Sequence, residues 1–323
     1  MEGNKRDKSV DCIRGLAIFS VICAHCSSNL DKSNKIAEAS SIVLSNIGTY
    51  GVVCFFFLSG YLFHYNNDFV GYWEKRLNRL IVPWVISASI VYFYVYIRKH
   101  QISILTWVNF VIGNGSYLYY ITILLALTLL FTLFGFLRNT YSLILLTAVS
   151  VISNLILWDE FCITPYLNVF NWVGYFSLGV LAQRSNLSLK ALFGNQIIKV
   201  SIVILEIGAI TYVLLWQFTG SYWGIPGFII SVTGAFFLFE LGIIISKFKY
   251  ISFFSVTCGK ESYFIYLWHM PIAGVTARLM GIGILNSFLI FRPVIILLVM
   301  YIVIRLISIF PSNRMKKGIG IQK

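Results

Sequence analysis

Apolar runs of about 20 residues recur along this chain, and they constrain its fold more than any other feature. Their length matches the thickness of a bilayer, in which a helix satisfies its own backbone hydrogen bonds. Of the 323 residues, 58% are hydrophobic and only 11% are charged, which excludes an ordinary soluble domain. The roughly ten-residue alternating segments of a membrane β-barrel are absent. The sequence therefore predicts an all-α integral membrane protein.

We expect about ten transmembrane helices. They lie at approximately 11–28, 44–66, 80–97, 116–137, 140–158, 166–183, 197–218, 225–246, 261–279 and 287–309. Residues 29–43 are predicted to form a polar loop and residues 67–79 a charged loop. The stretch 102–113 is too short to cross the bilayer comfortably and is predicted to be interfacial or re-entrant. The whole chain, 1–323, is predicted to be one transmembrane domain without a soluble domain.

Basic residues are spread in short clusters between the apolar runs, although the net charge is +13. Of the 25 Lys and Arg residues, 17 fall in segments predicted to be cytoplasmic and 6, including Arg292, in segments on the other side. This is the positive-inside pattern, so the partner that the charge predicts is a lipid bilayer and not a nucleic acid. We expect both termini to be cytoplasmic, in a multi-pass protein of the cytoplasmic (inner) membrane.

The first predicted helix, DCIRGLAIFSVICAHC, carries two groups that lipid tolerates poorly, Arg14 and His25. They are eleven positions apart. At 100° per residue the two side chains point within about 20° of the same direction around the helix axis, so they share a face. They are about 16 Å apart along that axis. A charge inside a bilayer is costly, so such residues face a bundle interior, a cavity or a partner. The alternative for each residue alone is that it reaches a headgroup interface.

Cys23 and Cys26 flank His25, so a metal site is a further reading of this segment. Neighbours on a helix point in different directions, and no second Cys/His cluster completes a site. We therefore expect no metal and no disulfide framework.

Lys75, Arg76 and Arg79 lie in the predicted charged loop, at the cytoplasmic start of the third predicted helix. Arg76 and Arg79 are three apart, which places them on one helical face. Two guanidinium groups at that spacing can grip a phosphate or pyrophosphate. The alternative is an ordinary basic cluster that binds lipid headgroups.

Two further ionisable residues lie inside apolar runs, His269 and Glu206. His269 precedes Pro271 and is a candidate for substrate binding or proton handling, or is simply packed. Glu206 is deep in its predicted helix and requires a partner such as Arg14, or a proton.

Several segments together resemble the membrane acyltransferase-3 family. They are RGLAIFSVICAH with Arg14 and His25, FFFLSGYL (Phe55 to Leu62), KRLNRLIVPW (Lys75 to Trp84), FSLGVL in the sixth predicted helix, and GKESYFIYLWHMPI (Gly259 to Ile272). The first segment and the basic block are the most specific. The matches keep their order over nearly the whole chain.

The resemblance implies an O-acyltransferase that moves an acyl group, typically acetyl from acetyl-CoA, to a sugar hydroxyl of a surface polysaccharide or a lipid-linked precursor. It implies His25 and Arg14 as essential site residues, and Arg76 and Arg79, with neighbouring Lys75, as contributors to CoA binding. His269, Glu206 and Ser59 of FFFLSGYL are further candidates for substrate contact or support. The chain departs from larger members, which carry a C-terminal esterase-like domain.

The chemistry of acyl transfer also suits these residues directly. An alcohol is a poor nucleophile, so its attack on a thioester needs a base such as a neutral histidine. His25 acts either as that base or as the acyl carrier in a two-step relay, and Arg14 steadies an oxyanion or the donor phosphates. Their separation predicts that Arg14 meets the donor on the cytoplasmic side and that His25 acts nearer the acceptor. The main alternative is a transporter or flippase of a glycan precursor, although no inverted repeat is visible.

Overall fold

A computed structural model describes residues 7–27, 34–65, 68–97, 102–160, 164–280, 283–309 and 318–321. Over these ranges the regular structure consists of helices and contains no β-strand. Six helical runs in the same ranges are long and apolar enough to cross a membrane. They are Lys35–Tyr61, Phe69–Tyr96, Thr140–Leu157, Gln196–Leu215, Gly224–Ile245 and Ser287–Ile309. The prediction of an all-α membrane protein is confirmed, whereas the number of spans and the side of each terminus stay predictions.

The chain divides into two compact units. Unit 1 comprises Met1–Phe55 and Leu187–Leu306, and unit 2 comprises Phe56–Asn186 and Ile307–Lys323. The boundary falls inside one long helix, α2 (Lys35–Tyr61), which supplies residues to both.

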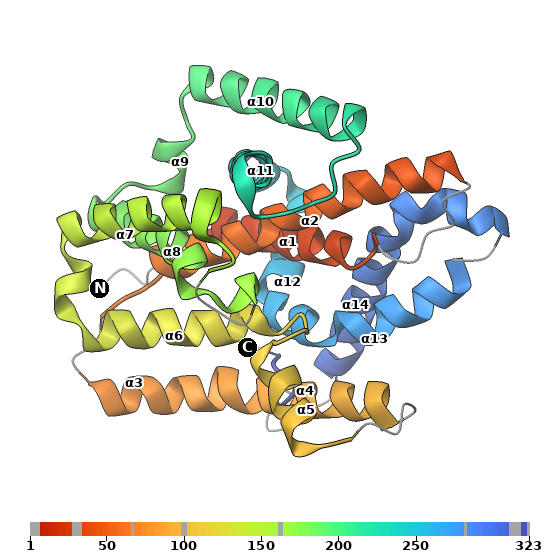
Figure 1. The fold of residues 1–323 in the computed structure, drawn as a ribbon, viewed down its shortest axis with the longest axis horizontal. Coiled ribbons are helices and arrows are strands. Elements are labelled where there is room, and N and C mark those ends of the chain that lie inside the picture. The colour runs from red at the N-terminus through yellow and green to blue at the C-terminus, as the bar shows by residue number, and fades with distance from the viewer. Residues whose placement is uncertain are drawn as a thin grey trace. The chain divides into compact units, whose positions relative to one another are not determined.

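Unit 1 is built around α1 (Lys8–Ala24), which begins where the Asp7 side chain accepts a hydrogen bond from Ser9 N at 2.9 Å. The other helices of this unit are α9 (Leu189–Leu192), α10 (Gln196–Leu215), α11 (Gly224–Ile245), α12 (Lys249–Lys260), α13 (Ser262–Met280), η6 (Gly283–Phe291) and α14 (Arg292–Ile309). α1 contacts α11, α12 and α13 (Figure 1). Most of its side chains are buried, which explains why its sequence is apolar all round.

Small residues bring the helices of unit 1 close to α1. A Cβ atom added at Gly259 of α12 would overlap the Asp11 carbonyl oxygen, and one at Gly15 of α1 would overlap the Ser255 carbonyl oxygen. On the α2 side, Ser20 Oγ donates to Ile47 O and accepts from Gly51 N. Close backbone approach through small residues is the usual way in which helices associate in lipid.

Unit 2 is held together by aromatic rings. Its helices are the end of α2, α3 (Phe69–Arg76), η1 (Leu77–Ile81), α4 (Val82–Tyr96), α5 (Ile104–Ile112), α6 (Tyr119–Leu133), η3 (Gly135–Arg138), α7 (Thr140–Ile152), η4 (Ser153–Leu157), η5 (Pro165–Leu167) and α8 (Val169–Arg184). Phe56 lies 4.8 Å from the Tyr120 ring and 5.0 Å from the Trp172 ring, centroid to centroid. Phe131 and Phe176 add a second pair at 5.0 Å. The ring faces and edges pack α2, α6 and α8 against one another.

The prediction of a charged loop at 67–79 is wrong for the described residues. From Phe69 to Tyr96 the chain is continuously helical, through α3, η1 and α4. Asp68 caps the start by accepting from Gly71 N at 2.9 Å. The π turn η1 lies just before Pro83, whose ring has no N–H and would clash with the carbonyl four residues earlier. Pro83 is the second residue of α4, which continues without a break from α3 and η1.

Two other expected loops are also helical. α2 begins at Lys35, inside the predicted loop 29–43, whose residues 29–33 lie outside the described ranges. The segment 247–260, which lies between the predicted helices 225–246 and 261–279, contains α12, and α12 packs along α1 through Ser255 and Gly259. α5 has nine residues, in agreement with the prediction that 102–113 is too short to span.

Candidate functional site

His25 lies at the C-terminal end of α1. The helix ends at Ala24, and His25 caps it with its backbone N–H donating to Ile22 O at 3.1 Å. Its side chain is only partly exposed. Arg14 lies on the same uninterrupted helix, about three turns earlier, and is also partly exposed. The structure thus places both predicted residues on one helix of unit 1.

His269 of α13 lies beside His25. The two rings are 5.1 Å apart between centroids and are tilted by 45°. His269 is fully buried, and its Nδ1 lies 2.8 Å from Tyr266 O and 3.1 Å from Ile265 O. A carbonyl oxygen only accepts hydrogen bonds, so the proton of a neutral His269 is on Nδ1 and Nε2 is its acceptor nitrogen. The paired histidines come from opposite ends of the sequence.

Arg292 holds the end of α1 against α13. It is 2% exposed, and its Nε donates to Thr276 Oγ1 at 3.1 Å. Nη1 donates to Cys26 O at 3.2 Å and Nη2 to Ala273 O at 2.6 Å. The Cys26 carbonyl immediately follows His25, so this guanidinium fixes the backbone that carries the first histidine.

Sequence reasoning missed Arg292 because it was counted among the cations outside the membrane. It is buried inside a bundle instead. The signal was present in NSFLIFRPVIILL, where a single arginine interrupts an apolar run directly before Pro293. An intramembrane charge of this kind marks a functional or structural site.

Together, His25, His269 and Arg292 offer a base and a cation in one buried place. An imidazole acceptor nitrogen can take a proton from an alcohol, and a guanidinium can stabilise developing negative charge. Among the described residues, the three hydrogen-bond partners of Arg292 are neutral oxygens. Its positive charge is therefore not cancelled by those groups, which favours an anionic group or transition state nearby.

Glu206 has a different partner from the one expected. Tyr50 of α2 donates its hydroxyl to Glu206 Oε1 at 2.7 Å, and both residues are at least 95% buried. This bond ties α10 to α2 within unit 1. Arg14 is therefore not required to explain why a carboxylate lies in α10. Ser59 belongs to unit 2, where its Oγ lies 3.2 Å from the Tyr120 hydroxyl.

The basic block, Lys75, Arg76 and Arg79, also lies in unit 2. Arg76 donates to the Tyr72 hydroxyl, and its guanidinium lies over the Tyr72 ring at 4.7 Å from the centroid. Lys75 and Arg79 are exposed. The π turn begins at Leu77, and i→i+5 hydrogen bonding has more residues per turn than an α-helix. Arg76 and Arg79 are therefore turned further apart than the α-helical spacing predicts.

Comparison with known proteins gives one family match. A family model described as an acyltransferase domain, Acyl_transf_3, matches residues 7–310, nearly the whole chain. No curated protein and no solved structure matches the chain significantly.

Proposed function

The chain belongs to the membrane acyltransferase-3 family and is a multi-pass membrane acyltransferase, and we propose that it is an O-acyltransferase acting on a sugar hydroxyl. The proposed donor is an acyl-CoA, with acetyl-CoA as the typical case in the family. The proposed acceptor is a surface polysaccharide or a lipid-linked sugar at the cytoplasmic (inner) membrane. The observation that carries this proposal is the His25–His269 pair, 5.1 Å between ring centroids, beside buried Arg292.

In this proposal His25 is the general base. It removes the proton from the sugar hydroxyl as the oxygen attacks the thioester carbon, and CoA thiolate leaves with its electron pair. His269 lies against the His25 ring and is itself oriented by the Tyr266 carbonyl, so it supports the ring that does the chemistry. Arg14 is proposed to meet the donor about 16 Å away along α1.

The basic block of unit 2 is proposed to bind the phosphates of CoA. Lys75 and Arg79 are exposed, and Arg76 is oriented by Tyr72, so charged donors are presented along one helix. Guanidinium groups are well suited to phosphate oxygens because their donors form a planar fork.

The experiment is transfer of radiolabelled acetyl-CoA into surface glycan by membranes that carry the wild type or His25→Ala at equal expression. We expect label with the wild type and loss of it with His25→Ala. Arg278→Ala, an exposed arginine at the end of α13, is the matched control and should keep the wild-type rate. Equal label in wild type and His25→Ala would remove His25 from the chemistry, and absence of label with the wild type would favour a transporter.

Donor dependence gives a second, separate test. Arg76→Ala combined with Arg79→Ala should raise the KM for acetyl-CoA about tenfold or more, since two charge-assisted contacts are lost. The maximal rate should change less. A transporter of a glycan precursor would show no response to acetyl-CoA in either protein.

A further inference from the structure

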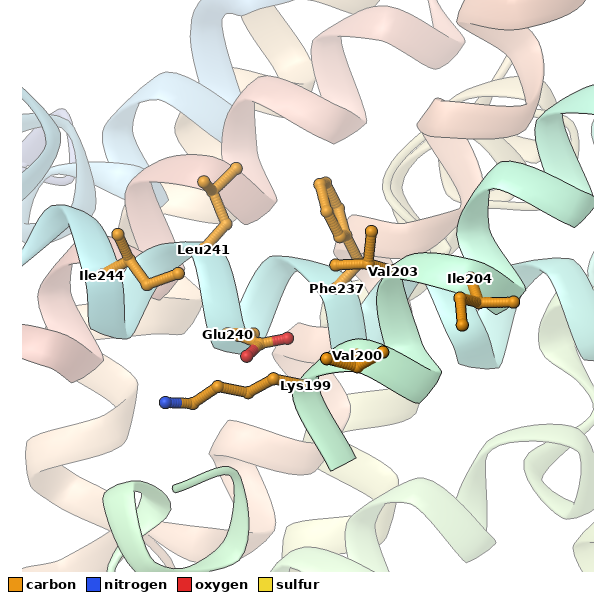
Figure 2. Close-up of a pocket in the computed structure, with 8 residues that line it drawn as sticks. All are labelled: Lys199, Val200, Val203, Ile204, Phe237, Glu240, Leu241 and Ile244. Atoms are coloured by element: carbon orange, nitrogen blue, oxygen red, sulfur yellow. The ribbon is translucent and has the colours of Figure 1, made fainter. Parts of the chain in front are cut away.

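A groove between α10 and α11 lies apart from the histidine site within unit 1. Figure 2 shows its lining, which encloses about 340 Å³. Apolar side chains form most of the wall, and they are Val200, Val203, Ile204, Phe237, Leu241 and Ile244. Both helices are long and apolar enough to span a membrane. Val200 is 57% exposed and Ile204 is 62% exposed, so this wall faces the lipid in a membrane-spanning protein.

One buried carboxylate interrupts the apolar wall. Glu240 is 5% exposed and lines the groove, and its Oε2 has no hydrogen-bond partner in the part of the chain that the structure describes. The Lys199 side chain runs past this carboxylate (Figure 2). A buried acceptor without a donor is unfavourable, so the site is incomplete without a ligand that donates.

The charged end of the groove lies near the ends of two helices, where a membrane-spanning helix meets lipid headgroups. Lys199 is in the first turn of α10, and Glu240 is in the last two turns of α11. Lys247 and Lys249 follow α11 directly, so this end of the helix pair is basic. Phe237 lies one turn deeper than Glu240. The groove is therefore polar at its mouth and apolar along its depth, which is the pattern of an amphiphile.

We propose that this groove binds one phospholipid with an amine headgroup. The ammonium group donates to Glu240, the phosphate contacts Lys199, and one acyl chain lies along Val203 and Phe237. The volume is at the small end of the range for ligand sites, which suits a single chain. An anionic headgroup without an amine would bring its phosphate against the Glu240 carboxylate. A zwitterion matches both charges at once. This site goes beyond the proposed acyl transfer and does not depend on it.

The test is native mass spectrometry of the full chain in detergent with equal concentrations of phosphatidylethanolamine, phosphatidylcholine and phosphatidylglycerol. We expect the wild type to retain phosphatidylethanolamine about tenfold better than the other two, because only its headgroup offers N–H donors to the carboxylate. Glu240→Gln should abolish this preference. Lys190→Gln, which removes an exposed charge on α9 outside the groove, should keep it.

A groove-filling variant tests the location. Leu241→Trp should reduce retention of all three lipids. Equal retention of the three lipids by the wild type would overturn the proposal, and this comparison does not depend on how any variant folds. A preference that persists in folded Glu240→Gln would overturn it as well. So would a dimer that Leu241→Trp dissociates, since a second copy of the chain would then occupy the groove.

Discussion

Replacing Arg292 by methionine tests how the end of α1 is positioned for chemistry. Methionine has a long unbranched side chain, as arginine does, but it lacks the N–H groups that donate to Thr276 Oγ1, Cys26 O and Ala273 O. The residue that carries the base, His25, is adjacent to the released carbonyl. Displacing a reacting group by about 1 Å lowers the rate roughly 100-fold, so we expect kcat for acyl transfer to fall by about that factor. The KM for acyl-CoA should change little, because the basic block is untouched.

The expected loss of stability is smaller than the three hydrogen bonds suggest. Each bond from a charged donor contributes about 1.5–3 kcal/mol. Removing the guanidinium also relieves a desolvation penalty of several kcal/mol for a buried ion. We therefore expect the free energy of unfolding to fall by about 1–3 kcal/mol, which leaves the protein folded.

The assay combines initial rates of acetyl transfer with thermal unfolding of the purified protein. Arg292→Lys keeps the charge but cannot reach three acceptors with one ammonium group, so an intermediate rate is expected. Arg278→Met, on the exposed end of α13, is the control. If Arg292→Met kept the wild-type kcat per folded molecule, the guanidinium would only stabilise the packing of α1 against α13. Its role in positioning His25 would then be refuted.

The remaining predictions concern helix packing in unit 1. Tyr50→Phe removes the hydroxyl that donates to Glu206, and we expect the free energy of unfolding to fall by about 1–3 kcal/mol. Thermal unfolding in detergent measures this change. An unchanged free energy of unfolding would show that this bond does not stabilise the packing of α10 on α2. Gly259→Ala places a methyl group against the Asp11 carbonyl and should cost about 1–3 kcal/mol or more, whereas Gly274→Ala, in open space on a helix, should be neutral or slightly stabilising. Equal stability of the two alanine variants would contradict the close packing of α1 on α12.

The fold class could be predicted from the sequence because hydropathy and helix length are local properties. Backbone groups in lipid must be satisfied within each segment, so a long apolar run predicts a helix without knowledge of its neighbours. The first helix was predicted for this reason, although it runs from Lys8 to Ala24 and His25 is its C-terminal cap. The family was recognisable for a related reason, since its motifs are short segments with fixed spacing.

Two segments that were predicted to be loops, 69–81 and 249–260, are helical in the structure. The stretch 69–81 is charged, yet it is helical, and the π turn η1 joins α3 to the first turn of α4, where Pro83 lies. α12 is too polar to read as a span, but its small residues fit against α1. Charge and hydropathy describe how a segment meets solvent or lipid, and these two segments are helical for reasons that hydropathy does not report.

The sequence by itself determined that the protein is helical, lies in a membrane and has Arg14 and His25 on its first helix. Only the tertiary structure brought His269 and Arg292 to His25, across more than 240 residues of chain. It also gave Glu206 its partner Tyr50. Hydropathy fixes which segments are helices, but the partner of a buried polar group is decided by helix packing. A buried charge must find acceptors, and which acceptors lie within hydrogen-bonding distance depends on contacts that no local pattern encodes.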